Sequence, residues 1–301
     1  FFFFFFFFFS TLFFFFSTLL FFFFILPCTG TNTGTTLLRL QKPNDTTKEY
    51  SHWYKGLSLL LKVMSMTLSG NYVNFGVFAL YNDQSFTQAL TVSLQILLSM
   101  RLSDIMAYPK VRNIYFQFLS ISFKYHLESL VKVDTNTFVK LIMAFREGLE
   151  VAPDNTTINL CAASIDHLAS YTFRTKLRGG PASVAMRQHL ASVPTAFTEF
   201  FVMLLNNVMY RDMASCWSIS RPLLSLLLAS EATSQAAQQQ ILRTQSQEKY
   251  QPFQEAFKRM MVDIKPTLET SNRDRFSQRV NMFRAEVKQF MVRPPEFDAL
   301  S

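Results

Sequence analysis

The sequence predicts an all-α protein, an α–α superhelix in which helical hairpins stack as a solenoid. Apolar residues recur at helical spacing from Lys55 onward, and segments with the alternation of β-strands are nearly absent. Helix starts expected near residues 110, 156, 196 and 234 lie 46, 40 and 38 residues apart. Each interval has room for two helices, a period typical of HEAT and armadillo repeats, which bury their apolar faces by stacking. An irregular all-α domain is the alternative.

The amino-terminal region, residues 1–27, differs from the rest of the chain. It contains no charged residue and 17 of the 35 Phe. Its length is enough for a bilayer span, which needs about 20 apolar residues. Runs of Phe separated by repeats of Ser-Thr-Leu are instead typical of low-complexity sequence. Two interpretations stay open: a hydrophobic anchor, or an artefact of gene prediction. Residues 28–54 are polar and are expected to form a linker.

The expected solenoid covers residues 55–292, and residues 293–301 form a tail. Apolar side chains three and four residues apart mark the helices that face a core. The stripes run from Phe138 to Leu149, Ile158 to Leu168, Phe197 to Val208, Phe253 to Ile264 and Phe276 to Phe290. Residues 70–81 are the one contrary segment, with alternation around two glycines, and predict a loop that returns to a short helix.

Residues suited to helix starts lie between these stripes. Thr135, Asp154 and Thr195 are expected N-caps, because a side-chain oxygen there can accept a hydrogen bond from an unpaired N–H of the first turn. Proline is tolerated in a first turn but not in mid-helix. Ser220 is therefore expected to cap a helix that has Pro222 in its first turn.

The motifs argue against an enzyme. The four His are scattered, and HExxH, CxxC and GxSxG patterns are absent. Cys28, Cys161 and Cys216 are too far apart to form a disulfide framework or a zinc knuckle. No catalytic, cofactor or metal site is expected.

The net charge of the chain is +8, and its end is its most basic part. Residues 243–293 contain 11 Lys and Arg against 6 Asp and Glu. The last expected helix supplies Arg273, Arg275, Arg279, Arg284 and Lys288. Two interpretations stay open: a solvated helix face, or a docking face for an acidic partner protein. Specific nucleic-acid binding is disfavoured, because no aromatic side chains alternate with these residues on the exposed face.

Three phrases of the sequence, at residues 70–81, 217–224 and 272–287, occur in a distinctive order. Their motif residues are Asn71, Tyr72, Asn74, Phe75, Arg221, Pro222, Asn272, Asp274 and Phe276, all expected to have structural roles. Asn272 is expected to cap the last helix, with Asp274 in its first turn and Phe276 as an anchor. Together the phrases resemble the C-terminal part of the exportin-7 (Ran-binding protein 16) family of the importin-β superfamily, over about residues 55–290.

The resemblance implies a HEAT-repeat nuclear export receptor that carries protein cargo through nuclear pores with the GTP form of the small GTPase Ran. The implied partners are Ran-GTP, protein cargo and Phe-Gly nucleoporins, and the implied location is the nucleus and cytoplasm, with shuttling between them. Such a receptor holds no cofactor, since GTP is bound and hydrolysed by Ran. Members of the family are far longer and make their principal Ran contact through N-terminal repeats. The chain is therefore expected to be a fragment that lacks these repeats.

Two further hypotheses stay open. One is a HEAT-like scaffold that binds partner proteins without transporting them. The other is a membrane-anchored helical protein that uses residues 1–27 as its span.

Overall fold

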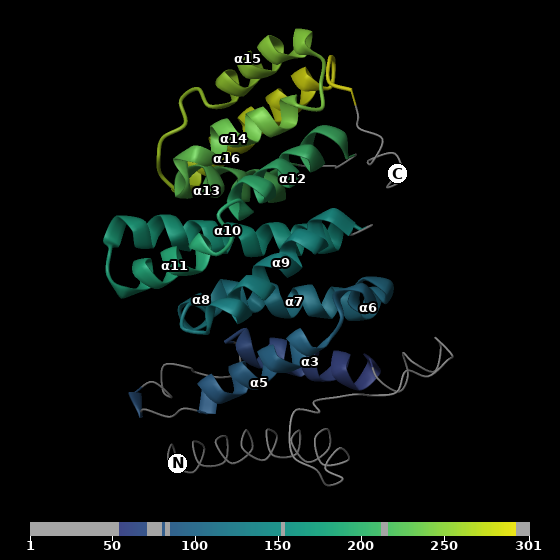
Figure 1. Cartoon of the computed structure of the whole chain (residues 1–301), viewed down its shortest axis with the longest axis vertical. Coiled ribbons are helices and arrows are strands. Elements are labelled where there is room, and N and C mark those ends of the chain that lie inside the picture. Colours follow the sequence, from purple (N-terminus) through teal and green to yellow (C-terminus); the bar gives the residue numbers. More distant parts are fainter. Residues whose placement is uncertain (1–53, 71–79, 82–84, 152–153, 212–215, 293–301) are drawn as a thin grey trace. The chain divides into compact units, whose positions relative to one another are not determined.

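The structure, a computed structural model, describes residues 54–70, 80–81, 85–151, 154–211 and 216–292. In these residues the regular secondary structure is helical throughout, which confirms the predicted all-α class (Figure 1). The chain divides into two compact units, residues 1–100 and 101–301. Residues 1–27, nearly all of the predicted linker and the predicted tail lie outside the described residues.

The first unit contains two described helices of ordinary length, α3 (Lys55–Leu68) and α5 (Ser85–Ser99). Each buries apolar side chains at helical spacing, namely Leu60, Leu61, Met64 and Leu68 on α3, and Leu90, Leu94 and Leu97 on α5. Of the predicted returning loop, residues 70–81, only Gly70, Leu80 and Tyr81 are among the described residues. None of the described helices is both long enough and apolar enough to cross a membrane.

The second unit is a series of helical hairpins. In each hairpin two helices pack on one another: α6 (Leu102–Ala107) with α7 (Pro109–Tyr125), α9 (Thr135–Val151) with α10 (Asn155–Arg178), α12 (Ala196–Tyr210) with α13 (Trp217–Ala229), and α15 (Tyr250–Met260) with α16 (Thr270–Val287). The short helices α8 (Leu127–Leu130), α11 (Pro181–Ala191) and α14 (Glu231–Leu242), and the 3₁₀ turn η3 (Gln247–Lys249), lie between hairpins. This arrangement is the helical solenoid that the sequence predicts.

The hairpins join through two layers of helices. α7, α10, α13 and α16 form one layer, in which each helix packs on the next, while α6, α9, α12 and α14 succeed one another in the second. The expected helix starts coincide within three residues with those of α7, α10, α12 and α14. Two of these helices, α7 and α10, belong to the first layer, and the other two, α12 and α14, belong to the second. The sequence period locates helices, but it does not identify the helix on which each one packs.

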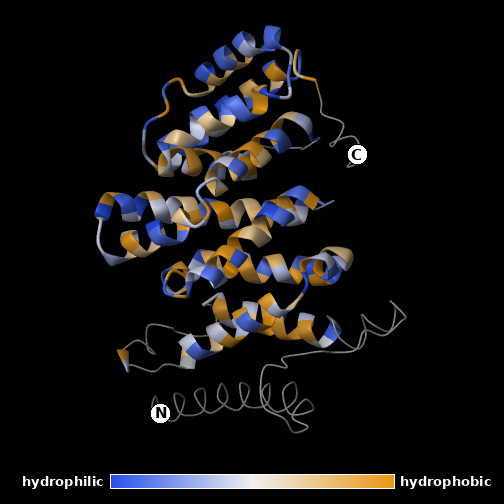
Figure 2. Ribbon diagram, in the orientation of Figure 1, coloured by the Kyte–Doolittle hydropathy of each residue, from blue (hydrophilic) through white to orange (hydrophobic). Residues whose placement is uncertain are grey.

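The predicted apolar stripes form the core of this unit. From Phe138 to Leu149, and likewise from Phe197 to Val208, each stripe residue is buried. Phenyl rings meet edge to face between hairpin partners, with centroids 5.8 Å apart for Phe253 and Phe283, a favoured geometry for aromatic pairs. The stripes expected to reach Ile264 and Phe290 end earlier, because α15 stops at Met260 and α16 stops at Val287. Figure 2 shows hydrophobic residues concentrated along α12 and α13.

Pro222 lies in the second turn of α13, which corrects the expectation of a first-turn position. The helix already begins at Trp217, after Cys216, so Ser220 lies within it and is not its cap. Pro222 has no N–H, so a single hydrogen bond to the Ser218 carbonyl is lost. Its ring is buried in the layer with its leucine neighbours, and this packing offsets that loss.

The three expected N-caps have different outcomes in the structure. Asp154 caps α10 as predicted, since its carboxylate accepts a hydrogen bond from the Thr157 N–H at 2.8 Å. At the start of α9 the acceptor is Asp134 rather than Thr135, with the Thr137 N–H at 2.9 Å. Thr195 precedes α12, but its hydroxyl makes no cap hydrogen bond and donates to Glu199 instead.

The Asp154 cap is tied to the preceding hairpin through Arg112 of α7. One guanidinium nitrogen of Arg112 lies 2.7 Å from Asp154 Oδ2, and another donates to the Met106 carbonyl at 2.7 Å. Burial alone would raise the pKa of Asp154, but the Thr157 hydrogen bonds and Arg112 outweigh it and lower this pKa from its usual value. The ionised cap therefore stabilises the folded state.

Gly148 marks the closest approach of α9 to its neighbours. A Cβ at this position would lie 2.6 Å from the Sγ of Cys161 on α10 and 2.7 Å from the ring of Phe116 on α7. Both neighbours are fully buried and cannot turn aside into solvent. The absence of a side chain therefore sets the spacing between these three helices.

We expect Gly148→Ala to lower the free energy of unfolding by about 1–3 kcal/mol, because overpacking outweighs the gain in helix propensity. Urea unfolding of the chain measures the difference. Met143→Ala, a change at an exposed position of the same helix, is the control, with an effect within about 0.5 kcal/mol. An unchanged or increased stability of Gly148→Ala would contradict the close approach.

A second expectation concerns acid. The pKa of Asp154 is lower in the folded chain than in the unfolded chain, so its stabilisation is complete above the unfolded pKa and is lost as pH falls through the folded one. Asp154→Asn keeps a capping side chain but loses the negative charge that pairs with the Arg112 guanidinium. We expect it to cost about 1–2 kcal/mol at pH 7, and to cost progressively less below about pH 4. Urea unfolding across this range measures the gap, and a gap that is independent of pH would contradict the prediction.

Candidate functional site

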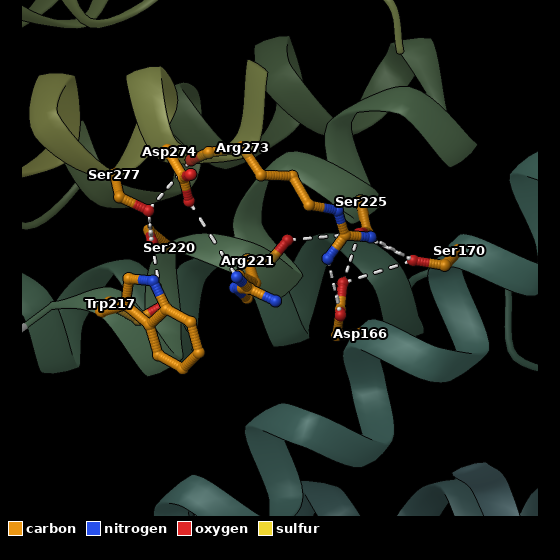
Figure 3. Close-up of polar contacts among 9 residues, drawn as sticks. All are labelled: Asp166, Ser170, Trp217, Ser220, Arg221, Ser225, Arg273, Asp274 and Ser277. Atoms are coloured by element: carbon orange, nitrogen blue, oxygen red, sulfur yellow. Dashed lines mark hydrogen bonds and ion pairs between the residues drawn. The ribbon is translucent and has the colours of Figure 1, made fainter. Parts of the chain in front are cut away.

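Figure 3 shows a polar seam that joins three consecutive helices of one layer, α10, α13 and α16. At its centre the guanidinium of Arg273, on α16, reaches past α13 to the carboxylate of Asp166 on α10. The Nη1 atom lies 2.9 Å from Asp166 Oδ2, and the two side chains are 10% and 14% exposed. This ion pair links residues 107 positions apart in the sequence.

Two serines complete the contacts of the pair. The Nη2 group of Arg273 donates to Ser170 Oγ at 2.8 Å and to Ser225 Oγ, on α13, at 3.3 Å. The Ser225 hydroxyl donates to Asp166 Oδ1, and the two serine oxygens lie 3.0 Å apart. Each helix of the three thus contributes at least one member, and the buried charges have the hydrogen bonds that burial requires.

The seam has no arrangement suited to nucleophilic catalysis. Activation of a serine requires a base that is free to take its proton, but the one carboxylate that Ser170 and Ser225 contact, Asp166, is paired with Arg273. The other hydrogen-bond partners of the two serines are Arg273, one another and the Arg221 carbonyl. His167 follows Asp166, but burial lowers the pKa of its imidazole, and the nearby charges of Lys124, Arg273 and Arg174 act in the same direction, against Asp166. Among the described residues no group of three metal-ligating side chains gathers. The contacts of the seam connect α10, α13 and α16.

The seam continues to the surface between α13 and α16. The hydroxyls of Ser220 and Ser277 lie 2.5 Å apart and are buried. Beyond them the guanidinium of Arg221 lies over the Trp217 ring, 4.0 Å from its centroid, and one of its nitrogens lies 4.0 Å from Asp274 Oδ1. Trp217 is 52% exposed, so this end of the seam is half in water.

Comparison with known proteins gives relatives over most of the chain. Exportin-7-B of Xenopus laevis is 33% identical over 249 residues, which is 79% of this chain and 22% of that protein. Ran-binding protein 17 of Homo sapiens is 27% identical over 245 residues, covering 78% of this chain and 22% of its own length. Ran-binding protein 16 of Drosophila melanogaster is 28% identical over 266 residues, which is 84% of this chain and 24% of that protein.

The chain is a homologue of exportin-7. The resemblance expected from the three sequence phrases, to a C-terminal part of exportin-7 and Ran-binding protein 16, is thereby confirmed. The chain spans about a fifth of the length of these relatives, from 22% to 24%. No family model and no solved structure matches the chain.

Two of the three phrases that carry the resemblance contribute to the seam. Arg221 and Pro222 lie on α13, and Asp274 and Phe276 lie on α16. Phe276 is fully buried. The remaining motif residues, Asn71, Tyr72, Asn74 and Phe75, lie outside the described residues.

Asn272 does not cap α16, which corrects the expectation. The helix begins at Thr270, after Glu269, so Asp274 lies in its second turn and not in the first turn as expected. Asn272 points back to the preceding loop. Its amide oxygen accepts from the Lys265 N–H at 2.9 Å, and its amide nitrogen donates to the carbonyls of Lys265 and Thr267 at 2.7 and 2.8 Å. Asn272 therefore fixes the loop between α15 and α16.

The five basic residues of the last helix, for which a solvated face and a docking face both stayed open, point in different directions. Arg273 lies in the seam, and Arg284 donates to the Arg211 carbonyl at 3.1 Å. Arg275 donates to the Asp263 carbonyl, while Arg279 lies 3.3 Å from the Asp263 carboxylate. Lys288 is exposed just after the helix. Docking of a partner on this face stays a prediction, and the four arginines already contact other groups of the chain.

The sequence offered little to identify Asp166, Ser170 and Ser225. A weak signal was present, since Ser225 interrupts a run of leucines on α13, and buried polar groups need partners. The partner of Asp166 could not be named, because the two members of the ion pair belong to different hairpins.

We expect Arg273→Met to destabilise the chain by about 3–5 kcal/mol, because it leaves the Asp166 charge buried without a counterion. Arg279→Met is the matched control on the same helix: its partner Asp263 is 67% exposed, so its loss should cost under about 1 kcal/mol. Urea unfolding measures both. Adding Asp166→Asn to Arg273→Met should recover part of the lost free energy of unfolding. Equal effects of Arg273→Met and Arg279→Met would contradict the prediction that the buried pair depends on its counterion.

Proposed function

We propose that the chain is part of a nuclear export receptor that carries protein cargo through nuclear pores in a manner that depends on Ran-GTP. The observation that carries the proposal is the 33% identity to exportin-7-B over 79% of the chain. The names of the relatives, exportin-7 and Ran-binding proteins 16 and 17, point to export and to Ran. The helical solenoid is consistent with them.

In this proposal the chain binds and does not catalyse. GTP enters only through Ran, which holds and hydrolyses it, so the receptor needs no cofactor of its own. Its other partners are protein cargo and Phe-Gly nucleoporins, and the receptor shuttles between nucleus and cytoplasm. Binding energy from Ran-GTP and cargo selects one arrangement of the helical repeats over another.

The packing of the second unit supports a mechanical role of this kind. Each hairpin packs mainly on its neighbours, so small changes between hairpins add up along a solenoid. The Arg273–Asp166 pair is an exception, since it connects α16 to α10 across α13. Residues around α10, α13 and α16 are therefore expected to move as one block, and changes of pitch are expected elsewhere.

The proposal is tested with the full-length gene product and Ran locked in its GTP or GDP form. We expect immobilised receptor to retain the GTP form and not the GDP form, because the two forms differ in the switch segments that a receptor recognises. Binding is measured by pull-down, with an unrelated small GTPase as the control. Equal retention of the two Ran forms would overturn the proposal and would favour a scaffold that binds partners without transport.

A further inference from the structure

The end of α10 extends beyond the core. The helix has 24 residues, and its last buried residue is Ser170. The eight residues that follow, 171–178, continue the helix for about 12 Å, at 1.5 Å per residue, without burying any side chain fully. Figure 1 shows this end of α10, together with α11, reaching to one side of the stack.

The extension is braced by a tight return of the chain. Gly179 and Gly180 have φ angles of 71° and 89° with extended ψ angles, a conformation that residues other than glycine rarely adopt. α11 then runs back beside α10. Its His189 stacks on Phe138 of α9 at 4.4 Å, and its Nε2 lies 2.9 Å from the Val131 carbonyl. We call residues 171–188 the α10–α11 arm.

The arm carries positive charge without acidic residues of its own. Residues 167–198 contain Arg174, Lys176, Arg178 and Arg187 and no Asp or Glu. All four are exposed. Lys176 has Glu231 at 3.8 Å, a pair that lies in water, and among the described residues the three arginines form no ion pair. This differs from α16, where Asp166 and Asp263 hold the arginines.

Apolar side chains accompany these charges. Leu177 is 71% exposed and Val184 is 58% exposed. Arg174, Leu177 and Arg178 are spaced i, i+3 and i+4, so they share one face of the helix. Figure 2 shows the tip of α10 as hydrophilic and α11 with mixed hydropathy. The two aromatic side chains of the arm, Tyr171 and Phe173, are half-buried, so neither offers a fully open ring on which a nucleic-acid base could stack.

We propose that the α10–α11 arm is a docking site for an acidic segment of a partner protein that also carries aliphatic side chains. Carboxylates of the segment pair with Arg174, Arg178 and Arg187, and an aliphatic side chain packs on Leu177. Arginine suits this role because its planar guanidinium binds a carboxylate through two hydrogen bonds. The proposal does not rest on the transport function, since it follows from the charge and exposure of the arm.

The test uses the whole chain and a fluorescent peptide of alternating Glu, Asp and Leu, with binding measured by anisotropy. We expect Arg174→Glu/Arg178→Glu to weaken binding by about tenfold or more, because like charges then face one another. Lys258→Glu/Lys265→Glu is the matched control: it changes the net charge by the same amount at exposed positions near the other end of the unit, and should change the affinity less than about twofold.

Three further measurements complete the design. Leu177→Ser should weaken binding of the Leu-containing peptide but leave unchanged the binding of a peptide in which Ser replaces Leu. Arg174→Gln/Arg178→Gln should give an intermediate loss, and thermal unfolding should be unchanged in every variant, since none of the altered side chains is buried. No binding by the parent chain, equal losses in the two charge-reversal variants, or tighter binding of a single-stranded oligonucleotide than of the peptide at the arm would each overturn the proposal.

Discussion

The second unit depends on a buried charge that must find its partner two helices away. The carboxylate of Asp166 and the guanidinium of Arg273 are both nearly out of water, and a charge in that position is tolerated only when it is paired and hydrogen-bonded. The pair forms only if α10, α13 and α16 are in register, because Ser225 of α13 lies between them. The apolar contacts bring these helices together, and the seam selects one alignment among those that would bury similar area.

This selectivity explains the uneven success of prediction from sequence. The helices themselves were predictable: the stripes at Phe138 and Phe197, the Asp154 cap and the starts of α7 and α10 are local features, each visible within a few turns of chain. The family was also recognisable, because ordered phrases are a property of the sequence. Hairpin pairing was not, since α9 packs on α10 and α12 on α13, and the apolar spacing of a helix does not identify its neighbour.

The errors at Pro222 and Asn272 have a common physical origin. A local rule places proline and capping residues near helix starts, and in both cases tertiary contacts extended the helix in the N-terminal direction. Burial among leucines holds the turn around Pro222, and three hydrogen bonds to a loop occupy Asn272. The charge pairing of α16 also depends on tertiary contacts. The sequence shows five cations in or next to one helix, but only the folded chain shows that Arg273 pairs with Asp166 and Arg279 with Asp263.

The placement of α8 and α11 between hairpins makes them natural sites for changes in length. An insertion within α10 or α13 would rotate each following side chain by about 100° around the helix axis and separate Asp166 from Arg273. An insertion at the Gly179–Gly180 return would lengthen only the arm, leaving the layer of α7, α10, α13 and α16 in register. Divergence in length is therefore expected to accumulate in the connecting helices, so the chain can acquire new surface loops while the spacing of its hairpins stays constant.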